Sequence, residues 1–203
     1  MEQYVITISR QFGSMGRSIA RELSEILGIE FLDRDIVEAT AKRMGLPVSV
    51  ISDEEESMKS TFFRRQYPLG MGMSSLKDEI FLTQKNIIRD FAAKGSCIIV
   101  GRCADYILRE HPRCANVFIS ASKEDRIARL CAMHHIDAEA AEEMIEKADK
   151  RRSEYYNYYS YKTWGAAATY HLCIDSSSLG IEETVRFLSL IHISEPTRRR
   201  GIS

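Results

Sequence analysis

The chain begins with a pattern of apolar and polar positions that predicts a strand, a turn and a helix. Tyr4–Ser9 is a mainly apolar run, and a turn containing Gly13 follows it. Apolar residues then recur at helical spacing over Gly16–Leu27, and Gly28 ends the pattern. In such a unit the backbone N–H groups of the turn and the positive end of the helix dipole face the same space. The pattern therefore predicts a phosphate-binding turn.

The rest of the chain alternates between short apolar runs and longer stretches with helical periodicity. This alternation favours an α/β fold in which helices cover both faces of a parallel sheet. The expected strands are Tyr4–Ser9, Ile29–Leu32, Ser96–Val100, Ala115–Ser120 and His171–Asp175. The expected helices are Gly16–Leu27, Asp35–Met44, Leu76–Ala93, Asp105–Glu110, Lys123–Met133, Asp137–Tyr156 and Ile181–Leu190.

Two segments depart from the alternation. Residues 45–75 carry an acidic patch, a basic aromatic patch and little periodicity, which is typical of a functional insertion or of a solvated loop. Residues 191–203 contain Pro196 and three consecutive arginines, and their sequence resembles a translated sequencing adapter. We expect this tail to be disordered or non-native and give it no functional role. We expect residues 1–190 to form a single domain.

Composition narrows the class of protein. The chain has 203 residues, 44% of them hydrophobic and 28% charged, with a net charge of −1. This is a globular composition, and the charge gives no support for binding nucleic acid or an anionic membrane. The cysteines are odd in number and form no C-x-x-C pair, and the chain has no signal peptide or apolar run of about 20 residues. We therefore expect a cytoplasmic protein with reduced thiols.

The turn after the first expected strand is a degenerate P-loop. The standard motif is G-x-x-x-x-G-K-S/T, and residues 11–18 read Gln-Phe-Gly-Ser-Met-Gly-Arg-Ser. Gln11 replaces the first glycine and Arg17 replaces the lysine, whereas the second glycine and Ser18 are retained. A planar guanidinium can bridge phosphate oxygens, although it is not equivalent to the compact ammonium of lysine. Ser18 is the expected Mg²⁺ ligand, and a tight turn with only a packing role is the alternative.

Charged residues also follow two other expected strands. Asp33 and Asp35 come after the second strand, where they are suited either to hold an acceptor hydroxyl or amine or to cap a helix. Arg102 follows the third strand directly after a glycine, and Asp105 lies just beyond it. An arginine at this position is well placed to bind a phosphate with two hydrogen bonds.

A basic cluster late in the chain is the last candidate site. Residues 149–152 read Asp-Lys-Arg-Arg late in a long helical segment, where they can cover transferring phosphates as a lid. The tyrosine-rich run 155–161 and Trp164 follow the cluster. Base stacking on a nucleic acid is one interpretation of that run, but the neutral net charge favours packing at a helix end.

Four stretches together resemble the cytidylate kinase-like family, relatives of bacterial CMP kinase. They are Gly-Ser-Met-Gly-Arg-Ser18, Phe-Leu-Asp-Arg-Asp35, Ile-Ile-Val-Gly-Arg102 and Asp-Lys-Arg-Arg152-Ser-Glu-Tyr-Tyr, and the resemblance extends from about Tyr4 to Leu190. It implies a three-layer α/β/α P-loop kinase fold with five parallel strands. It also implies a helical acceptor-binding insertion at 45–75 and a helical lid within 134–165.

The resemblance also implies roles for the candidate residues. The donor phosphates of ATP and Mg²⁺ would be held by Gly13, Ser14, Met15, Gly16, Arg17 and Ser18. The acceptor would be held by Asp33, Asp35, Arg102 and Asp105, with Arg64 and Arg65 from the insertion. Catalytic charge would come from Arg17, Arg151 and Arg152. Arg17 departs from the lysine that CMP kinases carry in this loop.

The function that follows is ATP-dependent phosphorylation of a nucleoside monophosphate, with CMP or dCMP as the first expectation. Because the insertion matches no cytosine-binding motif, a kinase for another small metabolite remains open. So does a nucleotide-binding sensor that has lost catalysis along with the lysine. The expected partners are small-molecule nucleotides, without nucleic acid or membrane, and the protein is expected to be a monomer or a homodimer.

Overall fold

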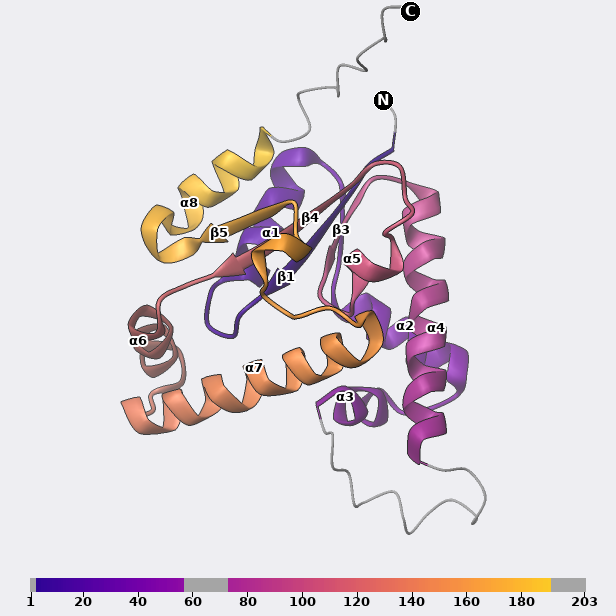
Figure 1. Ribbon diagram of the computed structural model, residues 1–203, viewed down its shortest axis with the longest axis horizontal. Coiled ribbons are helices and arrows are strands. Elements are labelled where there is room, and N and C mark those ends of the chain that lie inside the picture. Colours follow the sequence, from indigo (N-terminus) through magenta and orange to yellow (C-terminus); the bar gives the residue numbers. More distant parts are fainter. Residues whose placement is uncertain (1–2, 57–72, 191–203) are drawn as a thin grey trace, which may run out of the picture.

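A five-stranded parallel sheet forms the centre of the computed structural model, which describes residues 3–56 and 73–190 (Figure 1). The strand order is β2-β3-β1-β4-β5, and each adjacent pair is parallel. The strands are β1 (Val5–Arg10), β2 (Glu30–Leu32), β3 (Cys97–Val100), β4 (Cys114–Ser120) and β5 (Leu172–Asp175). The expected five-stranded parallel sheet is confirmed.

Eight α-helices connect and cover these strands in the described part of the chain. They are α1 (Gly16–Leu27), α2 (Arg34–Met44), α3 (Val48–Glu56), α4 (Met73–Lys94), α5 (Ala104–Ile107), α6 (Lys123–His134), α7 (Ala138–Ser160) and α8 (Ser176–Ser189). A short 3-10 helix, η2 (Ala167–Thr169), precedes β5. Within residues 3–56 and 73–190, no helix has the length and apolar character needed to cross a membrane.

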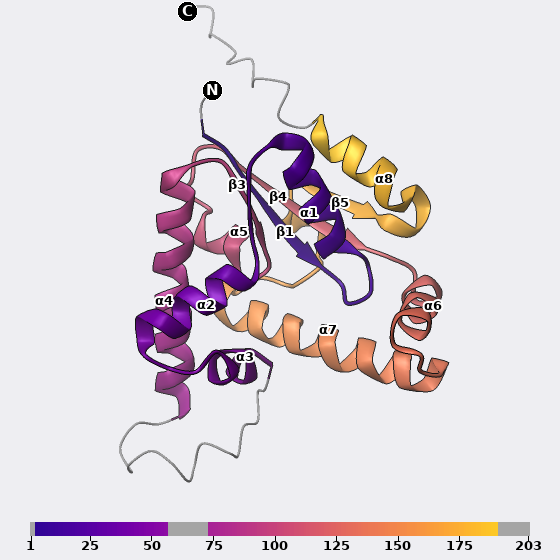
Figure 2. The ribbon, with the colours of Figure 1, turned by 180° about the vertical axis from the view of Figure 1, so that it is seen from behind.

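Strand side chains alternate between two apolar layers. Ile6 and Ile8 of β1 pack with α1 and α8 on one face, the face toward the viewer in Figure 2. Val5 of β1 and Ile99 of β3 pack with α4 and α5 on the other face. Because both faces are covered, β1 and β3 are buried along almost their whole length, including the polar Thr7 and Ser9 of β1.

The structure differs from the expected elements at two places. Residues 45–75, whose weak periodicity predicts no helix, contain α3 and the start of α4, in agreement with the helical insertion that the family resemblance implies, while 57–72 lie outside the described residues. The last helix begins at Ser176 instead of Ile181, because the Asp175 carboxylate accepts a hydrogen bond from Ser177 N and starts a short turn. That turn meets the main helix at Gly180, which has a left-handed φ of 72°. The tail at 191–203 also lies outside the described residues.

The parallel sheet places the carboxyl ends of its strands on one edge. β1 ends at Arg10, Asp33 directly follows β2, and Gly101 and Arg102 follow β3. Helix α7 runs past this edge from α6 toward α4 (Figure 1). The fold therefore brings together three candidate segments that are far apart in the sequence.

Candidate functional site

The turn between β1 and α1 has the backbone geometry of an anion-binding loop. Gly13 and Met15 have left-handed φ values of 77° and 62°, and α1 begins directly afterwards at Gly16. A turn of this kind directs successive N–H groups toward one space in front of the helix N-terminus. The space next to two of its residues is already filled. A Cβ at position 13 would lie 3.2 Å from Arg126 Cβ, and one at position 16 would lie 2.6 Å from Arg10 Cβ.

Side chains from two helices hold the carbonyl groups of this turn. Arg126 and Arg129 of α6 donate from Nη1 to the carbonyl oxygens of Phe12 at 3.4 Å and Gly13 at 3.3 Å. Ser176 of α8 donates to the carbonyl oxygen of Ser14 at 2.8 Å. Because these carbonyl groups and the N–H groups of Phe12 and Ser14 are all bonded within the protein, the conformation of the turn is fixed before a ligand arrives.

Two of the predicted loop residues have different surroundings. Ser14 is buried, and its hydroxyl donates to the carbonyl oxygen of Gln11 at 2.9 Å, so its side chain stabilises the turn. Ser18 is exposed in the first turn of α1, a position from which its hydroxyl is accessible.

Helix α7 is attached to the same turn. The Asp149 carboxylate accepts a hydrogen bond from Phe12 N at 2.7 Å and forms an ion pair with Arg126 at 2.6 Å. Arg152, one turn further along, donates to the carbonyl oxygen of Arg10 at 3.2 Å, and its guanidinium lies 5.3 Å from the centre of the Phe12 ring. The predicted lid therefore rests directly on the start of the loop.

Arg17 and Asp33 form an ion pair between α1 and the end of β2. Asp33 is buried, whereas about half of the Arg17 side chain is exposed. Asp33 occupies the N-cap position of α2, but its side chain makes no capping hydrogen bond, so the capping interpretation is wrong for this residue. Asp35 is exposed in the first turn of α2.

Arg10 lies at the centre of a group of charged side chains. Burial, followed by the positive charge of Arg152, lowers the pKa of the Arg10 guanidinium to about 9. Arg102 and Arg17 lower this pKa further, and Asp33 is the group that raises it. Four guanidinium groups thus interact with only two carboxylates beside them, Asp33 with Arg17 and Asp149 with Arg152, an arrangement that favours binding of an anion.

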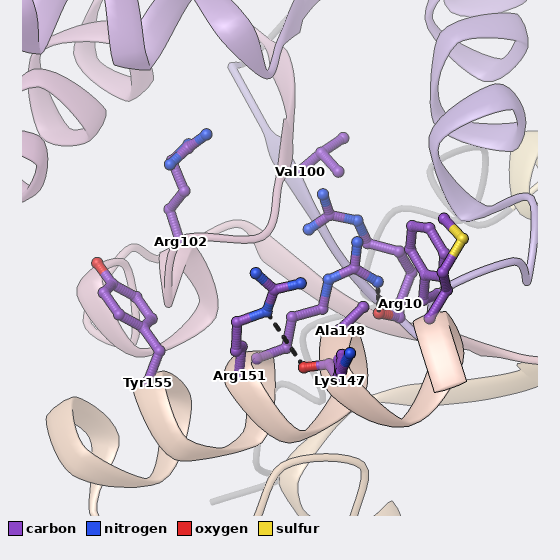
Figure 3. A pocket seen from close by; sticks show the side chains of 10 residues that line it. Arg10, Val100, Arg102, Lys147, Ala148, Arg151 and Tyr155 are labelled. Carbon is purple, nitrogen blue, oxygen red and sulfur yellow. Dashed lines mark hydrogen bonds between the residues drawn. The ribbon is translucent and has the colours of Figure 1, made fainter. Parts of the chain in front are cut away.

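A cavity of about 400 Å³ opens at this point (Figure 3). Its lining consists of Arg10, Phe12, Val100, Arg102, Met144, Lys147, Ala148, Arg151, Arg152 and Tyr155. Five of these side chains are cationic and none is a carboxylate. Figure 3 shows Arg151 and Tyr155 rising from α7 on one side, with Arg10 and Arg102 on the other. The cavity is therefore suited to phosphate or carboxylate ligands.

Three predicted acceptor residues in the described part of the chain do not line this cavity: Asp33, Asp35 and Asp105. Asp105 is buried, and its carboxylate accepts a hydrogen bond from the Tyr156 hydroxyl at 2.5 Å. Burial raises the pKa of Asp105 above its usual value. In this structure Asp105 joins the loop after β3 to α7 and does not face the acceptor space. Arg64 and Arg65 lie outside the described residues.

The tyrosine-rich run packs internally in most of its length. Tyr159 stacks on Phe81 of α4 at a centroid distance of 3.9 Å, and the Tyr155 hydroxyl donates to Gln84 at 3.2 Å. Tyr156 is buried, whereas Tyr161 is exposed. The packing interpretation of the run is confirmed for the residues that face α4.

Sequence reasoning missed several residues of the site. Arg10, Lys147 and Tyr155 line the cavity, and Arg126 and Arg129 hold the loop. Arg10 could have been predicted from the sequence, because an arginine at the carboxyl end of the strand before a P-loop lies at the edge of the sheet where ligands bind. The two arginines of α6 carried none, because solvated helix faces are rich in arginine and contact with the loop arises only in the fold.

Comparisons with known proteins agree with this geometry. The sequence model of the cytidylate kinase-like family matches residues 5–178. A search of curated proteins gives no significant match. An uncharacterized protein from Eubacterium ventriosum has 27% identity and a TM-score of 0.73, with 95% of this chain and 100% of that chain covered.

Two solved kinases share the fold at lower identity. A shikimate kinase from Acinetobacter baumannii, in complex with shikimate, has 15% identity and a TM-score of 0.55, with 97% of this chain and 96% of that chain covered. A gluconokinase from Sinorhizobium meliloti has 15% identity and a TM-score of 0.52, with 91% and 88% covered. The architecture is that of the P-loop kinases.

Proposed function

Because this chain belongs to the cytidylate kinase-like family, we propose that it transfers the γ-phosphoryl group of ATP to a nucleoside monophosphate, with CMP and dCMP as the preferred acceptors. The observation that carries this proposal is the cavity with five cationic side chains beside the P-loop. Phosphoryl transfer between two nucleotides brings together several negative charges, and such a reaction needs fixed positive charge more than it needs acid–base groups.

The proposed transfer requires only that the protein hold the two anionic nucleotides in position. The bond between the γ-phosphorus and the oxygen bridging it to the β-phosphate breaks, and that oxygen leaves with the electron pair as part of ADP. A phosphate oxygen of the acceptor forms the new bond to the γ-phosphorus and gives a nucleoside diphosphate. The acceptor attacks as a phosphate dianion, so no proton has to be removed by the protein.

The position of each group in the fold determines whether we assign it to the donor nucleotide or to the acceptor nucleotide. The turn at 11–16 and the N-terminus of α1 would hold the donor phosphates. Arg102, at the end of β3, would bind the acceptor phosphate on the other side of the cavity. Arg151 and Arg152 from α7 would neutralise the charge that develops on the transferring group.

The donor site has features that fit magnesium nucleotide. Ser18 is exposed at the N-terminus of α1, next to the turn that would hold the phosphates. The Ser18 hydroxyl would hold Mg²⁺ there, and the ion would supply positive charge that offsets the charge of the phosphates.

A nucleotide-binding sensor is the second candidate. The observation that favours it is the ion pair between Arg17 and Asp33, because the cation at the lysine position of the loop is already engaged by a carboxylate. A sensor would bind ATP without transferring its phosphoryl group.

The test is transfer from Mg·ATP to a panel of acceptors. The panel contains CMP, dCMP, UMP, AMP and GMP, together with shikimate and gluconate, because cations that bind phosphate also bind carboxylate. Turnover confined to CMP and dCMP supports the proposal. Turnover with a carboxylate sugar or acid assigns a metabolite kinase instead, and ATP binding without turnover assigns the sensor.

A further inference from the structure

We infer that Arg10, and not Arg17, is the fixed cation that contacts the transferring γ-phosphoryl group, in place of the missing loop lysine. This inference rests on the proposed function, because it assigns a charge within that same site. It gives Arg10 a role that the P-loop pattern does not predict, since Arg10 lies just before the motif.

The first argument is that the fold reserves space for the Arg10 side chain. A Cβ at position 16 would lie 2.6 Å from Arg10 Cβ, and a Cβ at position 101 would overlap Arg10 Nη1. Arg10 thus extends from the start of α1 across to the loop after β3. The glycine at position 16 leaves room for the Arg10 Cβ, and the guanidinium lies against Gly101.

The second argument is the position of the guanidinium between donor and acceptor. Arg10 lies at the carboxyl end of β1, directly before the loop that would hold ATP, and its Nη1 lies over Gly101, next to Arg102. Its guanidinium lines the cavity with Arg102 and Arg151 (Figure 3). A group transferred from the loop toward Arg102 would pass this guanidinium.

The third argument is that Arg17 is engaged elsewhere. Its guanidinium pairs with buried Asp33 at the end of β2, while about half of the side chain is exposed. Moving Arg17 to a phosphate would leave a buried carboxylate without this partner, which is unfavourable. Asp33 offsets part of the positive charge around Arg10, but the guanidinium groups of Arg152 and Arg102 repel it, and binding of an anion would relieve this repulsion.

The experiment compares the affinities of ADP and AMP-PNP, a non-hydrolysable ATP analogue, in the presence of Mg²⁺. Fluorescence titrations use the full chain as wild type and as the variants Arg10→Met, Arg10→Lys and Arg17→Met. Arg109→Met is the matched control, because Arg109 is exposed on the surface next to Tyr106. Circular dichroism and the melting temperature establish that each variant folds.

We expect Arg10→Met to weaken AMP-PNP binding by about tenfold or more, with ADP affinity changed by less than about threefold. Arg10→Lys should lie between Arg10→Met and wild type, because a lysine retains the charge but not the planar fork. Arg17→Met and Arg109→Met should retain the wild-type ratio of the two affinities. If Arg10→Met does not fold, Arg10→Lys is used in its place. We then expect its ratio of AMP-PNP affinity to ADP affinity to be at least about threefold lower than that of wild type.

An unchanged ratio in both Arg10 variants, or a loss of AMP-PNP affinity in Arg17→Met instead, overturns the inference. A wild-type protein without preference for AMP-PNP over ADP overturns it as well. Failure of the proposed function appears differently, as a wild-type protein that phosphorylates no acceptor. The inference about Arg10 then stands or falls on the affinity ratio alone.

Discussion

At the scale of single residues, the site depends on how each arginine is surrounded. Arg10 lies against two glycines, Arg17 is paired with Asp33, and Arg152 bonds to a backbone carbonyl of the loop. Each guanidinium therefore has a defined place before any ligand arrives. Pre-organised charge of this kind stabilises a transition state because no reorganisation is needed during the reaction.

Replacement of Gly16 by alanine tests the packing of Arg10. The new methyl group would lie 2.6 Å from Arg10 Cβ, so the side chain has to move, and we expect a loss of stability of about 1–3 kcal/mol together with reduced activity. Gly95→Ala is the control, since a Cβ there would meet no atom within 4 Å. Urea denaturation and turnover measure both effects, and equal behaviour of the two variants would contradict the prediction.

Replacement of Arg152 by alanine tests the charge supplied by α7. If Arg152 neutralises the transferring group, turnover should fall by a factor on the order of 10³, with a smaller change in the KM for ATP. Arg186→Ala on α8 is the control, because Arg186 is exposed and pairs only loosely with Glu183, at 3.6 Å. Steady-state kinetics with the best acceptor decide, and full activity of Arg152→Ala would exclude the role.

At the scale of elements, α7 is both a cavity wall and a support of the P-loop. Asp149 connects it to Phe12 N and to Arg126 of α6, and Tyr156 connects it to Asp105 after β3. These contacts join the carboxyl ends of β1 and β3 through one helix. Displacement of α7 would therefore alter the loop and the Arg102 segment together.

Replacement of Asp149 by alanine tests this connection. It leaves Arg126, whose side chain is only 9% exposed, without its carboxylate partner, and we expect a loss of stability of about 3–5 kcal/mol. Asp149→Asn should lose less, because its amide oxygen still accepts from Phe12 N. Glu183→Gln removes an exposed ion pair and should change stability by less than about 1 kcal/mol. Chemical denaturation gives all three values, and similar losses in the alanine and control variants would refute the prediction.

At the scale of the whole molecule, the parallel sheet determines where charge is placed. Its carboxyl edge gathers Arg10, Asp33 and Arg102 from three strands, and α7 adds further cations over them. The net charge of the chain is only −1, so the positive cavity is a local property. A buried carboxylate, Asp105, lies behind this edge and links the molecule's stability to pH.

The pH dependence of stability tests the environment of Asp105. Burial raises its pKa in the folded protein above the ordinary value of 3.8, so the folded state holds this proton to a higher pH than the unfolded state does. The contribution of Asp105 to stability is therefore greatest at low pH and declines as the pH rises through the raised pKa. The free energy of unfolding of wild type minus that of Asp105→Asn should fall as the pH rises above about 4. A difference that does not vary with pH would contradict this assignment.

Much of the fold was predictable because its signals are local. The apolar runs of β1 and β3 and the helical spacing over Gly16–Leu27 are read from neighbouring residues, and the structure confirms them. The P-loop was predictable for the same reason, since its turn and its helix are contiguous. The cap that starts α8 at Ser176 was not foreseen, because a short turn of serines has no apolar periodicity.

The sequence by itself thus determined an α/β fold with a phosphate-binding turn at its first strand. Only the tertiary structure decided which charges meet: that Asp33 pairs with Arg17 instead of capping α2, that Asp105 is buried against Tyr156, and that Arg10 lines the cavity. The physical reason is that strand and helix formation depend on nearby residues. The partner of a charged side chain depends on strand order and helix packing, which bring together residues more than ninety positions apart, such as Arg10 and Gly101.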